Sequence, residues 1–104
     1  MKAIRRNGGY SIDTANNYID SKQPIYSLST ELEVQHKWQD NRPTDEVAGY
    51  KAWFSQEGLE PFEVKFDSQI KLPSYLAKVC FDKLEGCEVR NKVYFRAGAL
   101  KEVK

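Results

Sequence analysis

The sequence predicts a small all-β domain, either an antiparallel barrel or an open sheet of five or six short strands. Apolar and polar residues alternate along several segments, turn residues separate those segments, and helical periodicity is nearly absent. The 104 residues suffice for one core but not for two. We therefore expect one β domain over residues 25–104, preceded by an N-terminal segment over residues 1–24.

The N-terminal segment is the least defined part of the sequence. Asn7-Gly8-Gly9 indicates a turn or a flexible break. Ser11 is a suitable cap for a short helix within residues 11–20, in which Ile12, Ala15, Tyr18 and Ile19 would share one side. Irregular coil is the alternative, because the apolar pattern is short.

The central strand is expected between Tyr26 and Trp38. Successive strand residues point to opposite faces, so a period-two pattern predicts one buried and one wet face. At about 3.3 Å per residue this strand would be roughly 40 Å long, so we expect it to bend or bulge midway. The positions assigned to the buried face are the even ones: Tyr26, Leu28, Thr30, Leu32, Val34, His36 and Trp38.

The following segments continue the alternation. Residues 39–49 indicate a polar connector longer than a tight turn, and Leu84-Glu85-Gly86 indicates a reversal of the chain. The last strand is expected to begin at Val89 and to be broken near Arg90-Asn91. Residues 98–104 would extend that last strand. The core-facing positions predicted from phase are Tyr50, Ala52 and Phe54, then Phe62, Val64 and Phe66, then Ala77, Val79 and Phe81, and finally Val93, Phe95 and Ala97.

The net charge of +1 gives no bulk electrostatic reason to expect nucleic acid or an acidic membrane as a partner. The distribution of charge is uneven, however. Residues 25–73 hold five basic and nine acidic residues, whereas residues 74–104 hold seven basic and four acidic ones. Any surface that binds anions is therefore expected to draw on the two ends of the chain.

No catalytic constellation is visible, and we predict that the chain is not an enzyme and has no metal or cofactor. His36 is the single histidine and falls on the face predicted to be buried, which favours a structural role. A glycine-rich phosphate loop, paired metal-ligand spacings and a nucleophile elbow are all missing from the sequence.

The cysteines and the chain ends predict a cytoplasmic location. Cys80 and Cys87 are the only cysteines, and we expect two reduced thiols. The basic start of the chain is not followed by the apolar run of a signal peptide. No stretch approaches the roughly 20 apolar residues of a membrane helix.

Two exposed patches are candidates for binding nucleic acid. Trp53 falls out of phase with Ala52 and Phe54, which places it beside Lys51 on the opposite face. In the last strand, Lys92, Tyr94 and Arg96 are out of phase with the apolar positions. Aromatic rings interleaved with cations suit the binding of a single-stranded nucleic acid, because bases stack on the rings while the cations contact the phosphates. The alternative is that the N-terminal segment covers this face and makes Trp53 and Tyr94 a minor core.

Residues 43–103 contain Gly49-Tyr50, Val64-Lys65 and Tyr94-Phe95-Arg96-Ala97 in this order, and in this they resemble a group of small accessory proteins carried by conjugative elements and plasmids of Gram-positive bacteria. In that group a polar loop leads through a Gly-Tyr pair into a strand, a short turn and a Val-Lys strand, and an aromatic-rich strand lies near the C-terminus. The residues here that match are Gly49-Tyr50, Val64-Lys65, Val79, Phe81, Leu84, Gly86 and Tyr94-Phe95-Arg96-Ala97.

This resemblance implies an OB-fold-like barrel. It also implies a role like that of the members that act as helicase-processivity or single-strand-binding factors. We therefore predict that the chain binds single-stranded DNA weakly and without sequence preference, with RNA as a further candidate. This binding would serve the replication or transfer of a mobile element. Trp53 and Tyr94 would stack bases, and Lys51, Lys92 and Arg96 would contact phosphates. The alternative function is a protein-interaction module that docks a helicase, a relaxase or another copy of itself through a strand edge.

Overall fold

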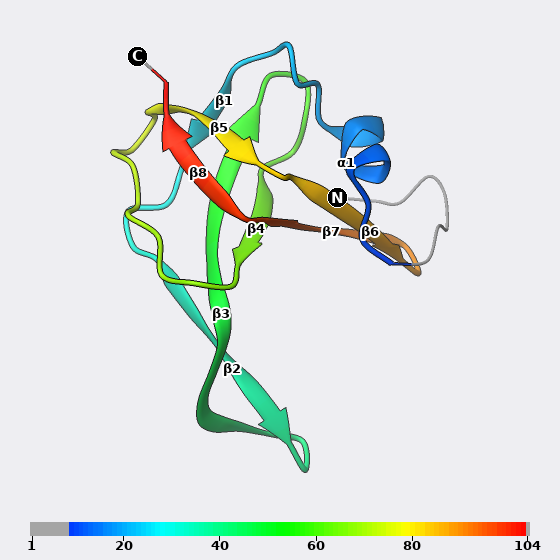
Figure 1. The fold of residues 1–104 in the computed structure, drawn as a ribbon, viewed down its shortest axis with the longest axis vertical. Coiled ribbons are helices and arrows are strands. Elements are labelled where there is room, and N and C mark those ends of the chain that lie inside the picture. Colours follow the sequence, from blue (N-terminus) through cyan, green and yellow to red (C-terminus); the bar gives the residue numbers. More distant parts are fainter. Residues whose placement is uncertain (1–8, 104) are drawn as a thin grey trace.

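The computed structural model describes residues 9–103, which form an all-β fold with one short helix (Figure 1). The expected all-β class is confirmed at this level. Eight strands share one sheet in the described part of the chain, not the five or six expected. In chain order the elements are α1 (Ile12–Tyr18), β1 (Ile25–Ser27), β2 (Glu33–Gln39), β3 (Arg42–Gln56), β4 (Phe62–Phe66), β5 (Lys78–Asp82), β6 (Glu85–Val89), β7 (Lys92–Ala97) and β8 (Ala99–Glu102).

The strand count is higher because expected long strands are interrupted. The strand expected over residues 26–38 is divided by residues 28–32 into β1 and β2. The last strand is divided at Gly98 into β7 and β8. The pairs in the sheet are antiparallel except for β4 and β7, which are parallel and pair Val64 with Phe95. The expectation of a purely antiparallel sheet is therefore wrong.

The connector expected over residues 39–49 is a tight turn followed by strand. Asp40 and Asn41 both have positive φ, of 53° and 62°, and they join β2 to β3 as a two-residue hairpin turn. Asp and Asn tolerate this left-handed backbone, which matches the twist of paired strands. The remaining residues to Gly49 belong to β3, so a β2–β3 hairpin projects from the body of the molecule (Figure 1).

The projection explains why the predicted faces of the central strand are wrong. In β1 the buried residues are Ile25 and Ser27, so the buried phase is odd instead of even. Along β2 the pairing with β3 shifts register on both sides of His36, and among the described residues no core covers either face of the hairpin. Val34 is 42% exposed, and His36 is exposed opposite Val47.

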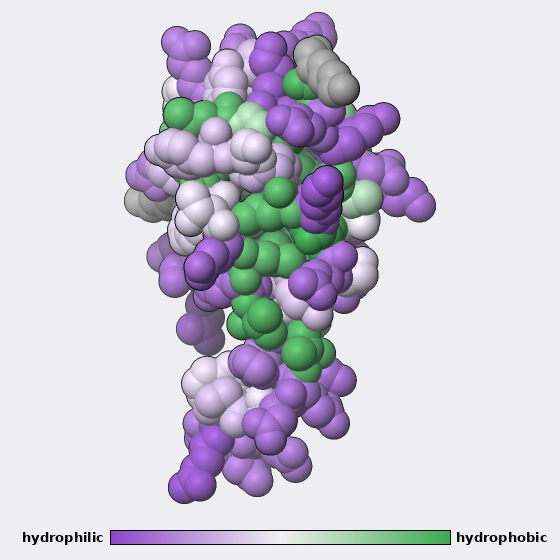
Figure 2. Space-filling view, turned by 90° about the vertical axis from the view of Figure 1, so that its left-hand side faces the viewer, coloured by the Kyte–Doolittle hydropathy of each residue, from purple (hydrophilic) through white to green (hydrophobic). Residues whose placement is uncertain are grey.

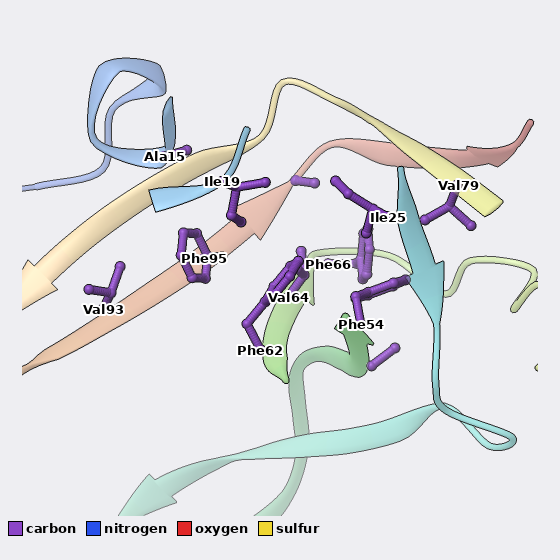
Figure 3. Close-up of a cluster of buried hydrophobic side chains, with 12 residues drawn as sticks. Ala15, Ile19, Ile25, Phe54, Phe62, Val64, Phe66, Val79, Val93 and Phe95 are labelled. Carbon is purple, nitrogen blue, oxygen red and sulfur yellow. The ribbon is translucent and has the colours of Figure 1, made fainter. Parts of the chain in front are cut away.

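The core is enclosed by the curved sheet, and the helical segment adds Ala15 and Ile19 to it. Phe54 is fully buried at its centre, and its ring contacts those of Phe62, Phe66 and Phe81, with centroids 6.3, 6.4 and 4.8 Å away. Figure 3 shows the labelled side chains of β3, β4 and β7 converging on this space. The predicted phases of residues 52–54, 62–66 and 93–97 are confirmed.

The helix belongs to the same core. Ser11 caps it by accepting a hydrogen bond from the Thr14 backbone N–H at 3.1 Å, as the sequence indicates. Ala15 and Ile19 are buried in the core, and the ring of Tyr18 meets Phe95 edge-on at 6.5 Å. Residues 11–20 therefore pack as part of the β domain. The expected break at Asn7-Gly8 lies outside the described residues.

Gly86 allows this close approach of the helix. A Cβ atom on Gly86 would lie 3.0 Å from the backbone nitrogen of Ala15, closer than atoms normally pack.

The turn expected at Leu84-Glu85-Gly86 does not reverse the chain. The chain instead reverses at Arg90-Asn91, between the paired residues Val89 and Lys92.

We predict that Phe54→Ala lowers the free energy of unfolding by about 3–5 kcal/mol, because it removes buried ring surface and leaves a cavity. Val34→Ala, on the exposed hairpin, is expected to change it by less than about 0.5 kcal/mol. Urea denaturation followed by circular dichroism measures both. Equal losses would contradict the placement of the core.

Gly86→Ala is expected to push α1 off β6 and to destabilise the protein by about 1–3 kcal/mol. Amide exchange should become faster in α1 than in β3 and β4. The matched control is Gly98→Ala, where the nearest atom is an ordinary 3.5 Å from the added Cβ. A stable Gly86→Ala protein with protected α1 amides would refute this packing.

Candidate nucleic-acid interface

The sheet has a second side, which faces away from the core and is called the outer face below. It is made by the residues of β3, β4 and β7 that alternate with the buried ones. These residues are exposed or half-buried, whereas the residues that lie between them in each strand are buried. The outer face comprises Lys51, Trp53, Glu63, Lys65, Lys92, Tyr94 and Arg96.

One row across the outer face joins two aromatic rings through a carboxylate. Trp53 of β3 pairs with Glu63 of β4, and the register of β4 with β7 places Tyr94 beside Glu63. Adjacent strands are about 4.8 Å apart, so the backbones of Trp53 and Tyr94 are separated by about 10 Å. The two side chains are 43% and 47% exposed, so each ring offers surface to a ligand.

The neighbouring row carries three cations in succession. Lys51 of β3 pairs with Lys65 of β4, which pairs with Arg96 of β7. Like charges on directly opposed residues destabilise a sheet, so this row of three cations lowers the stability of the fold. A carboxylate stands at each end of the row, since Glu33 pairs with Lys51 and Glu85 with Arg96.

The ion pairs divide these cations into two groups. The Lys51 ammonium lies 3.7 Å from Glu33 and 3.5 Å from Glu63. Arg96 donates a hydrogen bond from Nε to Glu85 at 2.8 Å. Among residues 9–103, neither Lys65 nor Lys92 takes part in an ion pair.

Lys65 reaches this position across a glycine. A Cβ atom on Gly49 would lie 2.8 Å from Lys65 Cε and 3.5 Å from its Cγ. The aliphatic part of the lysine therefore lies on the bare backbone of β3. This packing extends the ammonium group along the outer face.

Tyr10 adds a third aromatic ring at the β7 side of the face. The Arg96 guanidinium carbon lies 4.1 Å from the centre of the Tyr10 ring, a cation–π contact. Burial raises the pKa of the Tyr10 hydroxyl above its ordinary value, although Arg96 acts in the opposite direction. The hydrogen bond to Glu85 raises the pKa of Arg96, which stays charged. Arg96 is thus held between Tyr10 and Glu85.

These groups border a groove of about 500 Å³. Four of the five residues proposed from the sequence line it, and Arg96 lies beside it. Glu63 and Lys65 were not predicted from the sequence, although they alternate with Phe62, Val64 and Phe66 and could have been assigned to the exposed face. No sequence pattern indicated Tyr10 or Gln35 as groove residues. The residues around the groove are Tyr10, Gln35, Lys51, Trp53, Glu60, Pro61, Phe62, Glu63, Lys65, Lys92, Val93, Tyr94 and Phe95.

Residues 9–24 do not cover Trp53. Helix α1 packs on the core side, as the contact between Tyr18 and Phe95 shows. Of residues 9–24, Tyr10 is the one that borders the groove. The alternative of a minor core beneath this segment therefore does not describe Trp53, which is nearly half exposed.

The remaining candidate groups are dispersed. His36 lies on the projecting hairpin, and the expectation that it is buried is wrong. Cys80 is half-buried in β5 and Cys87 is buried in β6. Within residues 9–103 no group of three His, Cys, Asp or Glu side chains is arranged to hold a metal ion. The described part of the chain also lacks a helix of the length and apolarity needed to cross a membrane.

Comparison of the chain with protein-family models, curated proteins and solved structures found no match in any of the three.

Proposed function

We propose that this chain binds single-stranded nucleic acid, DNA in the first instance, along the outer face of β3, β4 and β7. The observation that carries the proposal is the row Lys51–Lys65–Arg96 beside the row Trp53–Glu63–Tyr94. Three adjacent cations cost stability and offer a track for phosphates. Two exposed rings beside them offer stacking surfaces for bases, worth about 1–3 kcal/mol per base.

We also propose that the sheet is an OB-like barrel, and the order of strand pairing supports this. β1 pairs with β3, β3 with β4, and β4 with β7. β7 continues through Gly98 into β8, which pairs with β5, and β5 pairs with β1. The hydrogen-bonded strand order is an open path with one parallel pair, and in the proposed barrel the continuous chain at Gly98 would join the two arms of this path.

The position of the groove fits this proposal. OB-folds bind oligonucleotides on the face of their second and third strands, between the loops that follow the first and fourth strands. Counting β1–β2 as the first strand makes β3 the second and β4 the third. The groove lies on these two strands and on β7, and it is bordered by Gln35 of the β2–β3 hairpin and by Lys92, which directly follows the Arg90-Asn91 turn.

The charges indicate weak binding that does not depend on a sequence motif. The outer face holds Lys51 and Arg96 in ion pairs, which leaves Lys65 and Lys92 as the best-placed phosphate contacts. The resemblance of residues 43–103 to accessory proteins of mobile elements would place this binding in replication or transfer.

The test of the binding face uses two tryptophans. Trp53→Ala is expected to weaken binding of a fluorescently labelled single strand five- to hundredfold, the equivalent of about 1–3 kcal/mol from one lost stack. Trp38→Ala is the matched control, because Trp38 is 69% exposed on the hairpin and does not border the groove. Fluorescence anisotropy measures both. Equal affinity of wild type and Trp53→Ala would contradict the proposal.

The salt dependence tests the phosphate contacts. Lys92→Met and Lys65→Met should each flatten the slope of log affinity against log salt by about 0.7, because one phosphate contact is lost. Methionine keeps the aliphatic stem of Lys65 on Gly49. Lys22→Met, outside the groove, serves as the control and should leave the slope unchanged. An identical slope in all four proteins would show that these lysines do not meet phosphates.

A second candidate function, a protein-interaction module, is favoured by the projecting hairpin. Val47 of β3 and both Val34 and Trp38 of β2 are exposed apolar or aromatic residues on an element that the core does not need. Figure 2 shows apolar surface that continues from the body onto the upper part of the hairpin. Such a hairpin can dock a helicase, a relaxase or a second copy through its open edges. In that case Trp38→Ala, not Trp53→Ala, would impair function.

A further inference from the structure

Strand β2 has an open edge. It pairs with β3 along one side, and among residues 9–103 no strand pairs with its other side. The hairpin that contains β2 projects from the body of the molecule, and six of the seven residues of β2 are exposed (Figure 1). The edge of such a strand presents unpaired backbone N–H and C=O groups, to which a further strand can bind.

Most of the features that protect strand edges are missing from β2. The strand contains neither proline nor glycine. Its pairing with β3 shifts register, but the extra residues lie in β3, because one step from Gln35 to His36 corresponds to two steps along β3. A bulge in β3 leaves β2 itself a regular strand. The protection that remains is charge, which Glu33 and Lys37 supply.

These two charges are complementary to a second copy of the same strand. In an antiparallel pair of β2 strands with a two-fold axis at Gln35, Glu33 of each copy lies directly opposite Lys37 of the other. Opposite charges that face each other across two strands stabilise a sheet. An axis at His36 would place both charges opposite glutamines, and an axis at Lys37 would oppose two lysines. Charge therefore favours the axis at Gln35.

Both charged side chains are available for this contact. The Glu33 side chain is 57% exposed and lies 3.7 Å from the Lys51 ammonium. The Lys37 side chain is 61% exposed and lies 3.5 Å from Glu46. Such exposed ion pairs contribute about 0–1 kcal/mol, and a carboxylate or an ammonium can bind a second partner at the same time. The contacts within one copy therefore leave the pairing between copies open.

The apolar side of β2 favours the same arrangement. Val34 and Trp38 are exposed, and among the described residues no core covers them. With the axis at Gln35, Val34 lies opposite His36 of the second copy and one diagonal step from its Trp38, within reach of an aromatic ring. Two short strands bury less than the roughly 1,200 Å² of a standard interface, so we expect a weak dimer that depends on protein concentration.

We propose that the chain associates with a second copy of itself through the edge of β2, as an antiparallel strand pair with two reciprocal contacts between Glu33 and Lys37. This inference goes beyond single-strand binding and does not depend on it. Among the partners that an open edge can bind, it selects the second copy, because the charges of β2 complement those of the same strand in reverse.

Analytical ultracentrifugation without nucleic acid tests the proposal. Wild-type protein should shift from monomer toward dimer as its concentration rises to the millimolar level. Glu33→Lys and Lys37→Glu each oppose like charges twice, so either variant alone should self-associate about tenfold more weakly. An equimolar mixture of the two variants should regain the wild-type affinity, because the cations of one variant then face the carboxylates of the other.

Glu57→Lys and Lys22→Glu are the matched controls, because they change the net charge equally at exposed residues outside the hairpin. Each should dimerise like wild type, and mixing the two should add nothing. A wild-type protein that stays monomeric, a β2 variant that dimerises fully, or a mixture of the β2 variants that stays monomeric would overturn the proposal. None of these results bears on the binding of an oligonucleotide, so the proposed function stands or falls separately.

Discussion

The packing of phenylalanine rings around Phe54 is the constraint on which the rest of the structure depends. Its contacts with Phe62 and Phe66 fix how β3 lies against β4. Because side chains alternate along a strand, fixing the inner face also fixes the outer one, and a slip of one residue would exchange them. The exposure of Trp53 and the position of Glu63 beside it are therefore consequences of the core.

The same constraint makes the outer face electrostatically unfavourable. Once β3, β4 and β7 are in register, Lys51, Lys65 and Arg96 must lie side by side. Acidic residues at the ends of the row and the ring of Tyr10 beside Arg96 offset part of the repulsion. Exposed ion pairs contribute little, about 0–1 kcal/mol each. A phosphate backbone along this row would reduce the repulsion further. The three cations would therefore lower the stability of the free protein and favour binding of a nucleic acid.

The sequence predicted the buried side chains correctly where the apolar positions of an alternating strand face the core. The alternation over residues 52–54, 62–66 and 93–97 identified which side chains face the core, and Ser11 identified the start of the helix. Over residues 26–38 the same alternation was misleading. A period of two residues shows that the two faces of a strand differ in polarity, but it does not show that a core packs against either face. The hairpin has a more apolar face without a core beneath it. The parallel pairing of β4 with β7 depends on contacts distant in sequence, and no local pattern could have indicated it.

The proposed function depends on contact between the outer face of β3, β4 and β7 and a single strand of nucleic acid. The most direct measurement is an NMR titration of labelled wild-type protein with an unlabelled oligonucleotide, followed through backbone amides and the tryptophan indole groups. If the outer face binds the oligonucleotide, the shifts will be concentrated at Lys51, Trp53, Lys65, Lys92 and Tyr94, and the Trp38 indole will not move. Shifts confined to the β2–β3 hairpin, or no shifts at low salt, would contradict the proposed function.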